Sequence, residues 1–300
     1  MLFKLWTPGI WHLVLGIGAL LVVSTLVVTV LQKWKPQWNL REVALRIYAW
    51  WIMAFVFVLA VGAPLWAALT FVCFVSFVAL REYISLIPTR KADRFALLMA
   101  FIAVPLQYFW VWRQWYGMFI IFIPVHAFLF IHLKMVLEGE TKGFLQAASS
   151  IQWGLMITVF SLSHMAYFMV LPQNEPMVGR SLLLFLVFLT QINDVAQFCF
   201  GKAFGKTPIL PKVSPKKTVE GFLGGVLTTV SLAYFLAPGL TPFQPLQAIA
   251  AGLIISVGGF FGDVTMSAVK RDLGIKDASN LIPGHGGILD RIDSLTYTAP

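Results

Sequence analysis

Residues 246–293 read LQAIAAGLIISVGGFFGDVTMSAVKRDLGIKDASNLIPGHGGILDRID, and the two parts of this stretch differ sharply in composition. Residues 246–262 are almost entirely apolar, and a run of this kind can form a helix that crosses a membrane. Residues 263–293 hold five of the chain's 13 acidic side chains, together with four basic side chains and a glycine-rich turn. The stretch therefore predicts a membrane span that leads directly into a polar segment.

The composition of the whole chain agrees with this prediction. Of the 300 residues, 59% are hydrophobic and only 12% are charged, and the mean hydropathy is +0.81. A soluble globular domain carries about 25% charged residues, so the composition excludes that class. Long apolar runs in lipid are helical, because a helix satisfies every backbone amide internally. The sequence predicts an all-α, polytopic integral membrane helical bundle in the lipid bilayer.

Nine apolar stretches approach the roughly 20 residues that a helix needs to cross the hydrocarbon core. The expected spans are 11–32, 46–62, 64–80, 95–112, 116–133, 144–171, 181–200, 221–238 and 246–262.

The basic residues indicate an orientation. If the N-terminus lies outside, the outer segments carry only three of the 22 Lys and Arg residues, which are Lys4, Arg113 and Arg180. Such asymmetry marks the cytoplasmic side of a membrane protein. We therefore expect a multi-pass protein of the cell inner membrane whose polar segment faces the cytoplasm. The formal charge of +9 then reflects topology and predicts no binding to nucleic acid.

Chemically interesting residues are concentrated late in the chain. We expect residues 1–180 to supply N-terminal transmembrane helices and residues 181–300 to form a C-terminal catalytic membrane region. Asn193 and Asp194 lie deep in the seventh span. A carboxylate inside a span is costly and usually faces a cavity, a cation or a partner. The alternative is a structural hydrogen bond or salt bridge between helices.

A basic loop precedes the eighth span. Ser214 and the proline after it interrupt the helix, and Thr218 is placed to cap the next one. Lys216 and Lys217 would add charge-assisted bonds to a phosphate at that helix N-terminus. The alternative is a basic cytoplasmic loop with an ordinary cap. The loop is not a Walker loop, because the Gly-x-x-x-x-Gly-Lys-[Ser/Thr] pattern is absent.

The polar segment offers a metal site. Asp263, Ser267 and Lys270 are spaced to share one helix face. Mg²⁺ is typically held by one or two carboxylates with substrate phosphates and water, and Asp290 could supply the second carboxylate. The glycine-rich turn allows close approach of a ligand, and His285 could bond a phosphate or a nucleotide. For each acid alone, the alternative is a salt bridge. Together the residues predict Mg²⁺-dependent phosphate chemistry on a lipid.

One pattern resembles the signature of the phosphatidate cytidylyltransferases, also called CDP-diacylglycerol synthases: Ser267-x2-Lys270-Arg271-x4-Lys276-Asp277-x5-Pro283-Gly284-His285-Gly286-Gly287-x2-Asp290-Arg291-x-Asp293. The upstream run from Asp194 to Gly221 is similar to the family too, so the resemblance is close over the C-terminal part of the chain. It is greatest to bacterial members, and it suits a second homologue beside a cell's main enzyme.

The resemblance implies transfer of CMP from CTP to phosphatidate, giving CDP-diacylglycerol and pyrophosphate in phospholipid biosynthesis. It also implies a cytoplasm-facing polar active-site cavity and a homodimer. Asp263 and Asp290 would hold Mg²⁺, with room for a second cation, and would be catalytic together with Lys270 and Arg271. The implied substrate-binding residues are Ser214, Lys216, Lys217, Thr218, Ser267, Lys276, His285, Gly286, Gly287 and Arg291.

Other functions stay open at this point. Gln197 stands where the family usually has an aromatic residue, and Lys202 where arginine is common. One alternative is therefore nucleotidyl transfer to another lipid phosphate. A second is a non-catalytic lipid-binding or transport paralogue. A transporter should place its charged groups at the membrane midplane between repeats, whereas the acids here gather at the end of the spans, which favours an enzyme.

Overall fold

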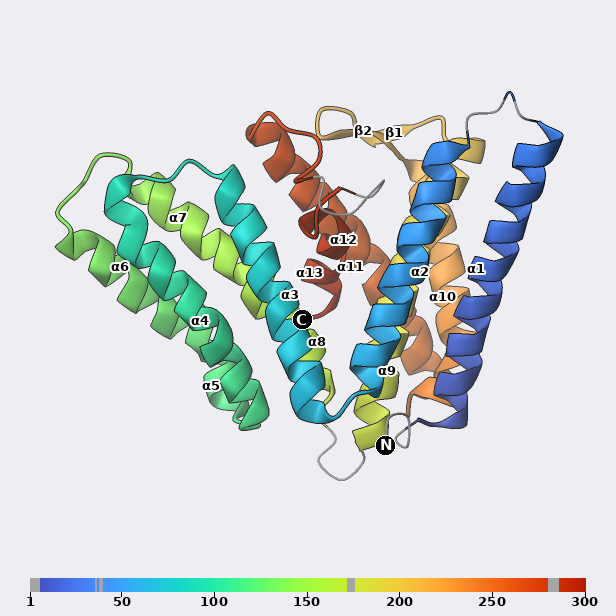
Figure 1. The fold of residues 1–300 in the computed structure, drawn as a ribbon, viewed down its shortest axis with the longest axis horizontal. Coiled ribbons are helices and arrows are strands. Elements are labelled where there is room, and N and C mark those ends of the chain that lie inside the picture. The colour runs from blue at the N-terminus through green and yellow to red at the C-terminus, as the bar shows by residue number, and fades with distance from the viewer. Residues whose placement is uncertain (1–5, 36, 38–39, 172–175, 280–285) are drawn as a thin grey trace.

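The computed structural model describes residues 6–35, 37, 40–171, 176–279 and 286–300. Figure 1 shows a bundle of long helices with one small β-hairpin, and we call the end of the bundle that carries this hairpin the hairpin end. The first half of the chain forms α1 (Pro8–Trp34), α2 (Arg41–Gly62), α3 (Leu65–Leu86), η1 (Lys91–Asp93), α4 (Arg94–Trp112), α5 (Tyr116–Ile121), η2 (Phe122–Ala127), α6 (Phe128–Leu137), α7 (Phe144–Leu155), η3 (Met156–Phe160) and α8 (Ser161–Phe168). The second half forms α9 (Pro176–Phe204), β1 (Pro208–Leu210), β2 (Ser214–Thr218), α10 (Val219–Leu240), α11 (Pro245–Asp272), α12 (Leu289–Ile292) and α13 (Leu295–Thr298).

The described residues include 8 helices that are long and apolar enough to cross a membrane. They correspond to all of the expected spans except 144–171, and they confirm a polytopic, multi-pass, all-α membrane protein. The helices are longer than the expected spans, because polar residues extend them beyond the apolar runs. For example, α11 runs on from the apolar stretch 246–262 through Lys270 and Arg271.

The stretch expected as a span over 144–171 is helical from Phe144 to Phe168 but is not among those 8. It is more polar than the others, and it packs against α3, α4 and η2. Thr158 and Ser163 are fully buried there and donate hydrogen bonds to the carbonyls of Gly154 and Phe160. Protein neighbours, more than lipid, surround this helix, so it needs less apolar surface than a lipid-facing span.

The β-hairpin was not expected in an all-α chain. β1 pairs with β2 in antiparallel fashion, with Pro208 opposite Thr218 and Leu210 opposite Ser214. Pro208, Pro211 and Pro215 interrupt any helix in this segment, since proline lacks an amide donor and clashes with the preceding turn. The hairpin lies across one end of the bundle, above α9, α10 and α11 (Figure 1).

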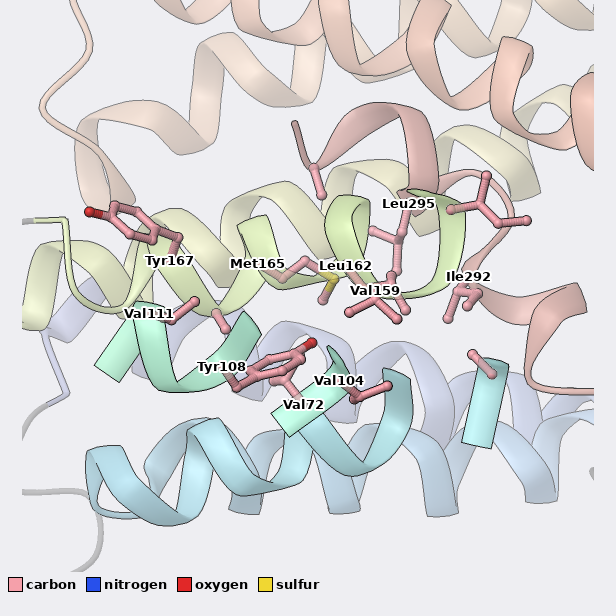
Figure 2. Close-up of a cluster of buried hydrophobic side chains, with 14 of the residues drawn as sticks. Val72, Val104, Tyr108, Val111, Val159, Leu162, Met165, Tyr167, Ile292 and Leu295 are labelled. Atoms are coloured by element: carbon pink, nitrogen blue, oxygen red, sulfur yellow. The ribbon is translucent and has the colours of Figure 1, made fainter. Parts of the chain in front are cut away.

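The segment after residue 286 folds back into the bundle. α12 contacts α3, and α13 contacts α8, α9 and α11. In Figure 2, Ile292 and Leu295 join a cluster of buried side chains from α3, α4, η3 and α8. The other labelled members are Val72, Val104, Tyr108, Val111, Val159, Leu162, Met165 and Tyr167. The signature region is therefore anchored by apolar side chains on both of its short helices.

Asn193 ties the three long C-terminal helices together. Its side chain is fully buried on α9, donates to the carbonyl of Ser256 on α11 (3.3 Å) and accepts from the Thr229 hydroxyl on α10 (3.2 Å). A Cβ on Gly225 would lie 3.0 Å from the Asn193 side-chain oxygen, so glycine permits this close approach of α9 and α10. Small residues and interhelical hydrogen bonds of this kind are typical of packing between membrane helices.

Candidate active site

Three carboxylates from distant parts of the chain come together near the hairpin end. We call Asp194 on α9, Asp263 on α11 and Asp293 after α12 the acidic cluster. Asp194 interacts electrostatically with both of the others. Ser294 links two members, since its hydroxyl donates to Asp194 (2.9 Å) and its amide to Asp293 (2.9 Å). Burial, followed by repulsion from Asp263, raises the pKa of Asp293 to about 7.

The helices place two members of this cluster at the same height. Asp194 and Asp263 each lie 18 residues after the first residue of their helices, and both helices run toward the hairpin end. At 1.5 Å per residue, each carboxylate is about 27 Å along its helix. The hydrocarbon core is about 30 Å thick, so helices that begin at one boundary with the lipid head groups would carry these carboxylates to the opposite boundary. A polar site at that boundary can meet a lipid phosphate without drawing it into the apolar core.

The hairpin supplies a cation to the cluster. The Lys217 ammonium on β2 lies 2.6 Å from Asp263 Oδ2, and 4.9 Å from the centre of the Phe260 ring. The Ser267 hydroxyl donates to the other oxygen of Asp263 (3.2 Å), as their shared helix face predicted. Lys217 also interacts with Asp194. Lys270 and Arg291 also interact electrostatically with Asp293, so three cations offset the negative charge of the three carboxylates.

Local contacts hold β2 where Lys217 can reach the cluster. The Thr218 hydroxyl accepts the Gly221 amide (3.2 Å) and so caps α10, which confirms the predicted cap. Glu220 accepts the amides of Lys206 (3.0 Å) and Thr207 (3.2 Å) and fixes the other side of the hairpin. A Cβ on Gly205 would lie 2.7 Å from the Thr218 hydroxyl, so this glycine lets α9 end against the cap.

Asp290 has a different environment from Asp263. Its Oδ1 accepts the Lys270 ammonium (2.7 Å), and its Oδ2 accepts the amides of Ala278 (2.9 Å) and Gly287 (2.9 Å). The carboxylate is buried and joins the two ends of the signature loop. Gly286 beside it has a φ of 78°, which favours glycine. The salt bridge that the sequence left open as an alternative is present at Asp290, and also at Asp263.

Three of the remaining predicted site residues, Arg271, Lys216 and Lys276, are exposed. Arg271 donates to the carbonyls of Val213 (3.4 Å) and Ile275 (3.3 Å). Lys216 and Lys276 are exposed, and neither has an ion pair with another described residue. Ser214 lies at the start of β2 and is partly buried, and the Nε of Arg291 is buried without a hydrogen-bond partner among the described residues. His285 lies outside the described residues.

Two contributors were not predicted as site residues. Asp293 was recognised only as the last position of the signature, and its electrostatic interaction with Asp194, 99 positions earlier in the chain, leaves no local pattern. Glu82 on α3 is buried and accepts the Leu289 amide (3.1 Å) beside Asp290. From the sequence alone, Glu82 would be interpreted as an ordinary charged residue at the end of a membrane span. No periodicity or spacing signal points to it.

The acidic cluster offers the oxygen ligands that Mg²⁺ prefers. Burial and the proximity of Asp263 raise the pKa of Asp293, and a bound divalent cation would favour the ionised form of this carboxylate. Among the described residues, no group of three or more His, Cys, Asp or Glu side chains is arranged to hold a metal ion. The cluster therefore fits an ion held by one or two carboxylates, with water and substrate oxygens completing its coordination. An ion on Asp290 would compete with Lys270 and two backbone amides.

Comparison with known proteins assigns the chain to a family. The model of the "Cytidylyltransferase family" matches residues 44–300. An uncharacterized Escherichia coli K12 protein, YnbB, is 44% identical over 282 residues, which cover 94% of this chain and 93% of YnbB. The Aquifex aeolicus phosphatidate cytidylyltransferase is 43% identical over 143 residues, 48% of this chain and 54% of that enzyme. The Haemophilus influenzae phosphatidate cytidylyltransferase is 42% identical over 132 residues, 42% of this chain and 46% of that enzyme. The matches to these two enzymes thus span about half of their length.

The match to the family model covers most of the chain. The chain therefore belongs to the cytidylyltransferase family.

Proposed function

We propose that the protein transfers CMP from CTP to phosphatidate and releases pyrophosphate, giving CDP-diacylglycerol for phospholipid synthesis. Membership of the family and the similarity to two bacterial phosphatidate cytidylyltransferases support this reaction. One structural observation carries the proposal: three carboxylates and Lys217 meet about 27 Å along α9 and α11, near the height of lipid head groups.

The reaction needs charge neutralisation more than base catalysis. An oxygen of the lipid phosphate attacks the α-phosphorus of CTP, a new P–O bond forms, and the bond to the β-phosphate breaks. The ionised phosphate is already nucleophilic, so the protein's task is to position the two phosphates in line and to offset their charge, as in phosphoryl transfer generally. Mg²⁺ held by Asp263, with Asp290 or the other members of the acidic cluster, would supply further charge stabilisation on phosphate oxygens.

The basic residues suit this task. Lys217 and Lys270 are each paired with a carboxylate, which holds their ammonium groups in fixed positions. Arg271, Lys216 and Lys276 are exposed and would attract the triphosphate. The buried, unpaired Nε of Arg291 is a donor that a substrate oxygen would satisfy. Ser214, Thr218, Ser267, His285, Gly286 and Gly287 complete the proposed substrate-binding set, through hydroxyl, imidazole and backbone groups.

The test is turnover by the purified protein in detergent with Mg²⁺, CTP labelled in its α-phosphate, and phosphatidate. We expect equal amounts of CDP-lipid and pyrophosphate, and no product in the presence of EDTA. Asp263→Asn should lower product formation about 100-fold or more. Asp272→Asn is the matched control, because this acid is exposed at the end of the same helix. A folded wild-type protein that forms no nucleotidyl lipid from any lipid phosphate would contradict the proposal.

A different lipid phosphate is the second candidate acceptor. The Gln197 side chain lies one helical turn beyond Asp194, and its Nε2 is buried without a hydrogen-bond partner among the described residues. A buried free donor can be satisfied by a polar head group that phosphatidate lacks. The same assay with phosphorylated lipids that carry additional hydroxyl groups separates the two candidates, and Gln197→Leu should then reduce only the use of such lipids.

We also propose that the hairpin end faces the cytoplasm, in the cell inner membrane. The distribution of Lys and Arg over the loops supports this orientation. In a variant without Cys73 and Cys199, Lys216→Cys should resist a membrane-impermeant maleimide in intact cells, and Gln114→Cys should react. The reverse labelling pattern would overturn the orientation.

A homodimer is part of the same proposal. α2 presents a row of exposed, large apolar side chains, among them Tyr48, Ile52 and Phe55, which lipid or a second copy must cover. The mass of the protein in detergent, measured by light scattering with correction for bound detergent, should be twice the 33.5 kDa of one chain. A mass of one chain would exclude the dimer.

A further inference from the structure

Glu82 is a buried carboxylate that belongs to the first half of the chain and yet contacts the signature turn. It lies in the last turn but one of α3 and is 8% exposed. Its Oε2 accepts the amide of Leu289, 207 residues away, at 3.1 Å. Burying a carboxylate costs several kcal/mol unless hydrogen bonds compensate, so a contact of this kind needs an explanation.

The turn is shaped to fit Glu82. A Cβ built on Gly287 would lie 1.6 Å from Glu82 Oε1 and 2.5 Å from its carboxyl carbon. These atoms are the end of the Glu82 side chain, so an alanine at 287 would fit only if that side chain moved and its bond to the Leu289 amide broke. Gly287 has no positive φ, unlike Gly286. The absence of a side chain at 287 is therefore required by the proximity of α3, and not by the backbone conformation.

Glu82 and Asp290 hold the same turn from two sides. Asp290 accepts the Gly287 amide from within the turn, and Glu82 accepts the Leu289 amide from α3. The remaining oxygen of Asp290 is bonded to Lys270 on α11. The position of Glu82 thus fixes where α12 begins, and through Asp290 it fixes where the Lys270 ammonium lies.

We propose that Glu82 is a positioning residue for nucleotidyl transfer: it docks the signature turn onto α3, so that Asp290 and Lys270 are held in register with the acidic cluster. The inference rests on the proposed function for its catalytic consequence. Its structural part, that Glu82 holds the turn, stands independently. Glu82 touches no reacting atom, and it acts only through the backbone at 287 and 289.

The structural part is tested by hydrogen exchange measured by mass spectrometry on the protein in detergent. In Glu82→Ala, peptides covering 286–294 should exchange about tenfold faster than in the wild type, the effect of losing about 1.4 kcal/mol of local protection. Tyr83→Phe is the matched control: it removes a hydrogen bond from the next residue of α3, to the carbonyl of Ser150, without touching the turn. Unchanged exchange in Glu82→Ala, or an equal increase in Tyr83→Phe, would overturn the proposal.

The catalytic part is tested by kinetics and by a second substitution. Glu82→Ala should lower kcat about tenfold or more with little change in the KM for CTP, and Glu82→Gln should retain more activity, because its side-chain oxygen can still accept the Leu289 amide. Gly287→Ala should cause a clearly smaller fold-loss of activity in the Glu82→Ala background than in the wild type, because the colliding carboxylate is gone. Additive effects of the two substitutions would refute the coupling.

The two proposals fail in different ways. A wild-type protein without cytidylyltransferase activity would refute the proposed function. The hydrogen-exchange result alone would then decide whether Glu82 holds the turn. An active wild type whose Glu82→Ala variant keeps full kcat would refute the positioning role alone.

Discussion

The ammonium group of Lys217 lies 2.6 Å from Oδ2 of Asp263, and this contact joins the β-hairpin to the end of a transmembrane helix. Both side chains are partly exposed, so they are open to a ligand from the hairpin end. Their pairing places a cation and a possible metal ligand side by side, which is the arrangement that a nucleotide phosphate requires.

Asp263→Asn should lower turnover about 100-fold or more, equivalent to roughly 2.7 kcal/mol of transition-state stabilisation. The substitution removes a metal-binding charge and leaves Lys217 without its partner, while the side chain keeps its shape. Steady-state kinetics measures the effect, and an unchanged unfolding temperature verifies that the variant is folded. Full activity in this variant would remove Asp263 from the metal site.

Asp290→Ala should lower the unfolding temperature much more than Asp263→Asn does. Asp290 is buried and accepts one ammonium and two amides, and breaking a buried ion pair by removing one partner typically costs about 3–5 kcal/mol. Lys270→Met in the Asp290→Ala background should recover part of the loss, because no unpaired charge remains. Thermal unfolding followed by tryptophan fluorescence would measure the series. Equal unfolding temperatures of Asp290→Ala and Asp263→Asn would contradict the anchoring role of Asp290.

The metal-free protein should become less stable as the pH rises from about 4 to about 7. The pKa of Asp293 is raised to about 7 by burial and by Asp263, so the folded state holds a proton that the unfolded state has released over this range. Protonated Asp293 therefore contributes to the stability of the folded protein at low pH. This contribution is lost as the pH rises through the pKa that Asp293 has in the folded state. Unfolding temperatures in EDTA between pH 4 and pH 8 should show the decline, and Asp293→Asn should flatten it.

Mg²⁺ should counteract that decline. A divalent cation that binds the ionised cluster stabilises the folded state more at pH 8 than at pH 5, because protons compete for the same carboxylate oxygens. The increase in unfolding temperature on adding Mg²⁺ at the two pH values measures the competition. An equal increase at both values would place the ion elsewhere.

Gly286→Ala and Gly274→Ala form a matched pair. Both glycines have positive φ, 78° and 70°, so alanine strains the backbone at both positions. A Cβ at 274 meets nothing within 4 Å, whereas a Cβ at 286 lies 2.5 Å from Asp290 Oδ2. Gly274→Ala should therefore cost only about 1 kcal/mol of stability and keep activity. Gly286→Ala should lose most of its turnover, and similar activity of the two variants would contradict a precise requirement at the turn.

The sequence predicts what is local in this protein. The apolar runs locate most helices because a span must be continuous and about 20 residues long. Thr218 was recognised as a cap, and Ser267 as a neighbour of Asp263, because both contacts are made within four residues of the chain. Lys270 was assigned to the same helix face, and it binds Asp290 instead of Asp263.

Long-range contacts were beyond such reasoning. Asp194 was identified as an unusual carboxylate, but its interaction with Asp293 depends on how α12 enters the bundle. Glu82 was not identified at all, since the segment 1–180 was expected to contribute transmembrane helices only. The division of the chain at residue 180 stays a prediction, and the contact between Glu82 and Leu289 crosses it.

The insertion of Ile292 and Leu295 among side chains of α3, α4 and α8 also bears on how the protein is made (Figure 2). A chain is synthesised from its N-terminus, and its early parts fold first. The earlier helices must therefore reach the membrane and leave room between them before residues 286–298 can enter. Until that late step, Asp290 and Asp293 are not in place, so a partly synthesised chain resides in the membrane with its basic loops exposed but without a complete site. The order of biogenesis itself keeps the unfinished protein inactive.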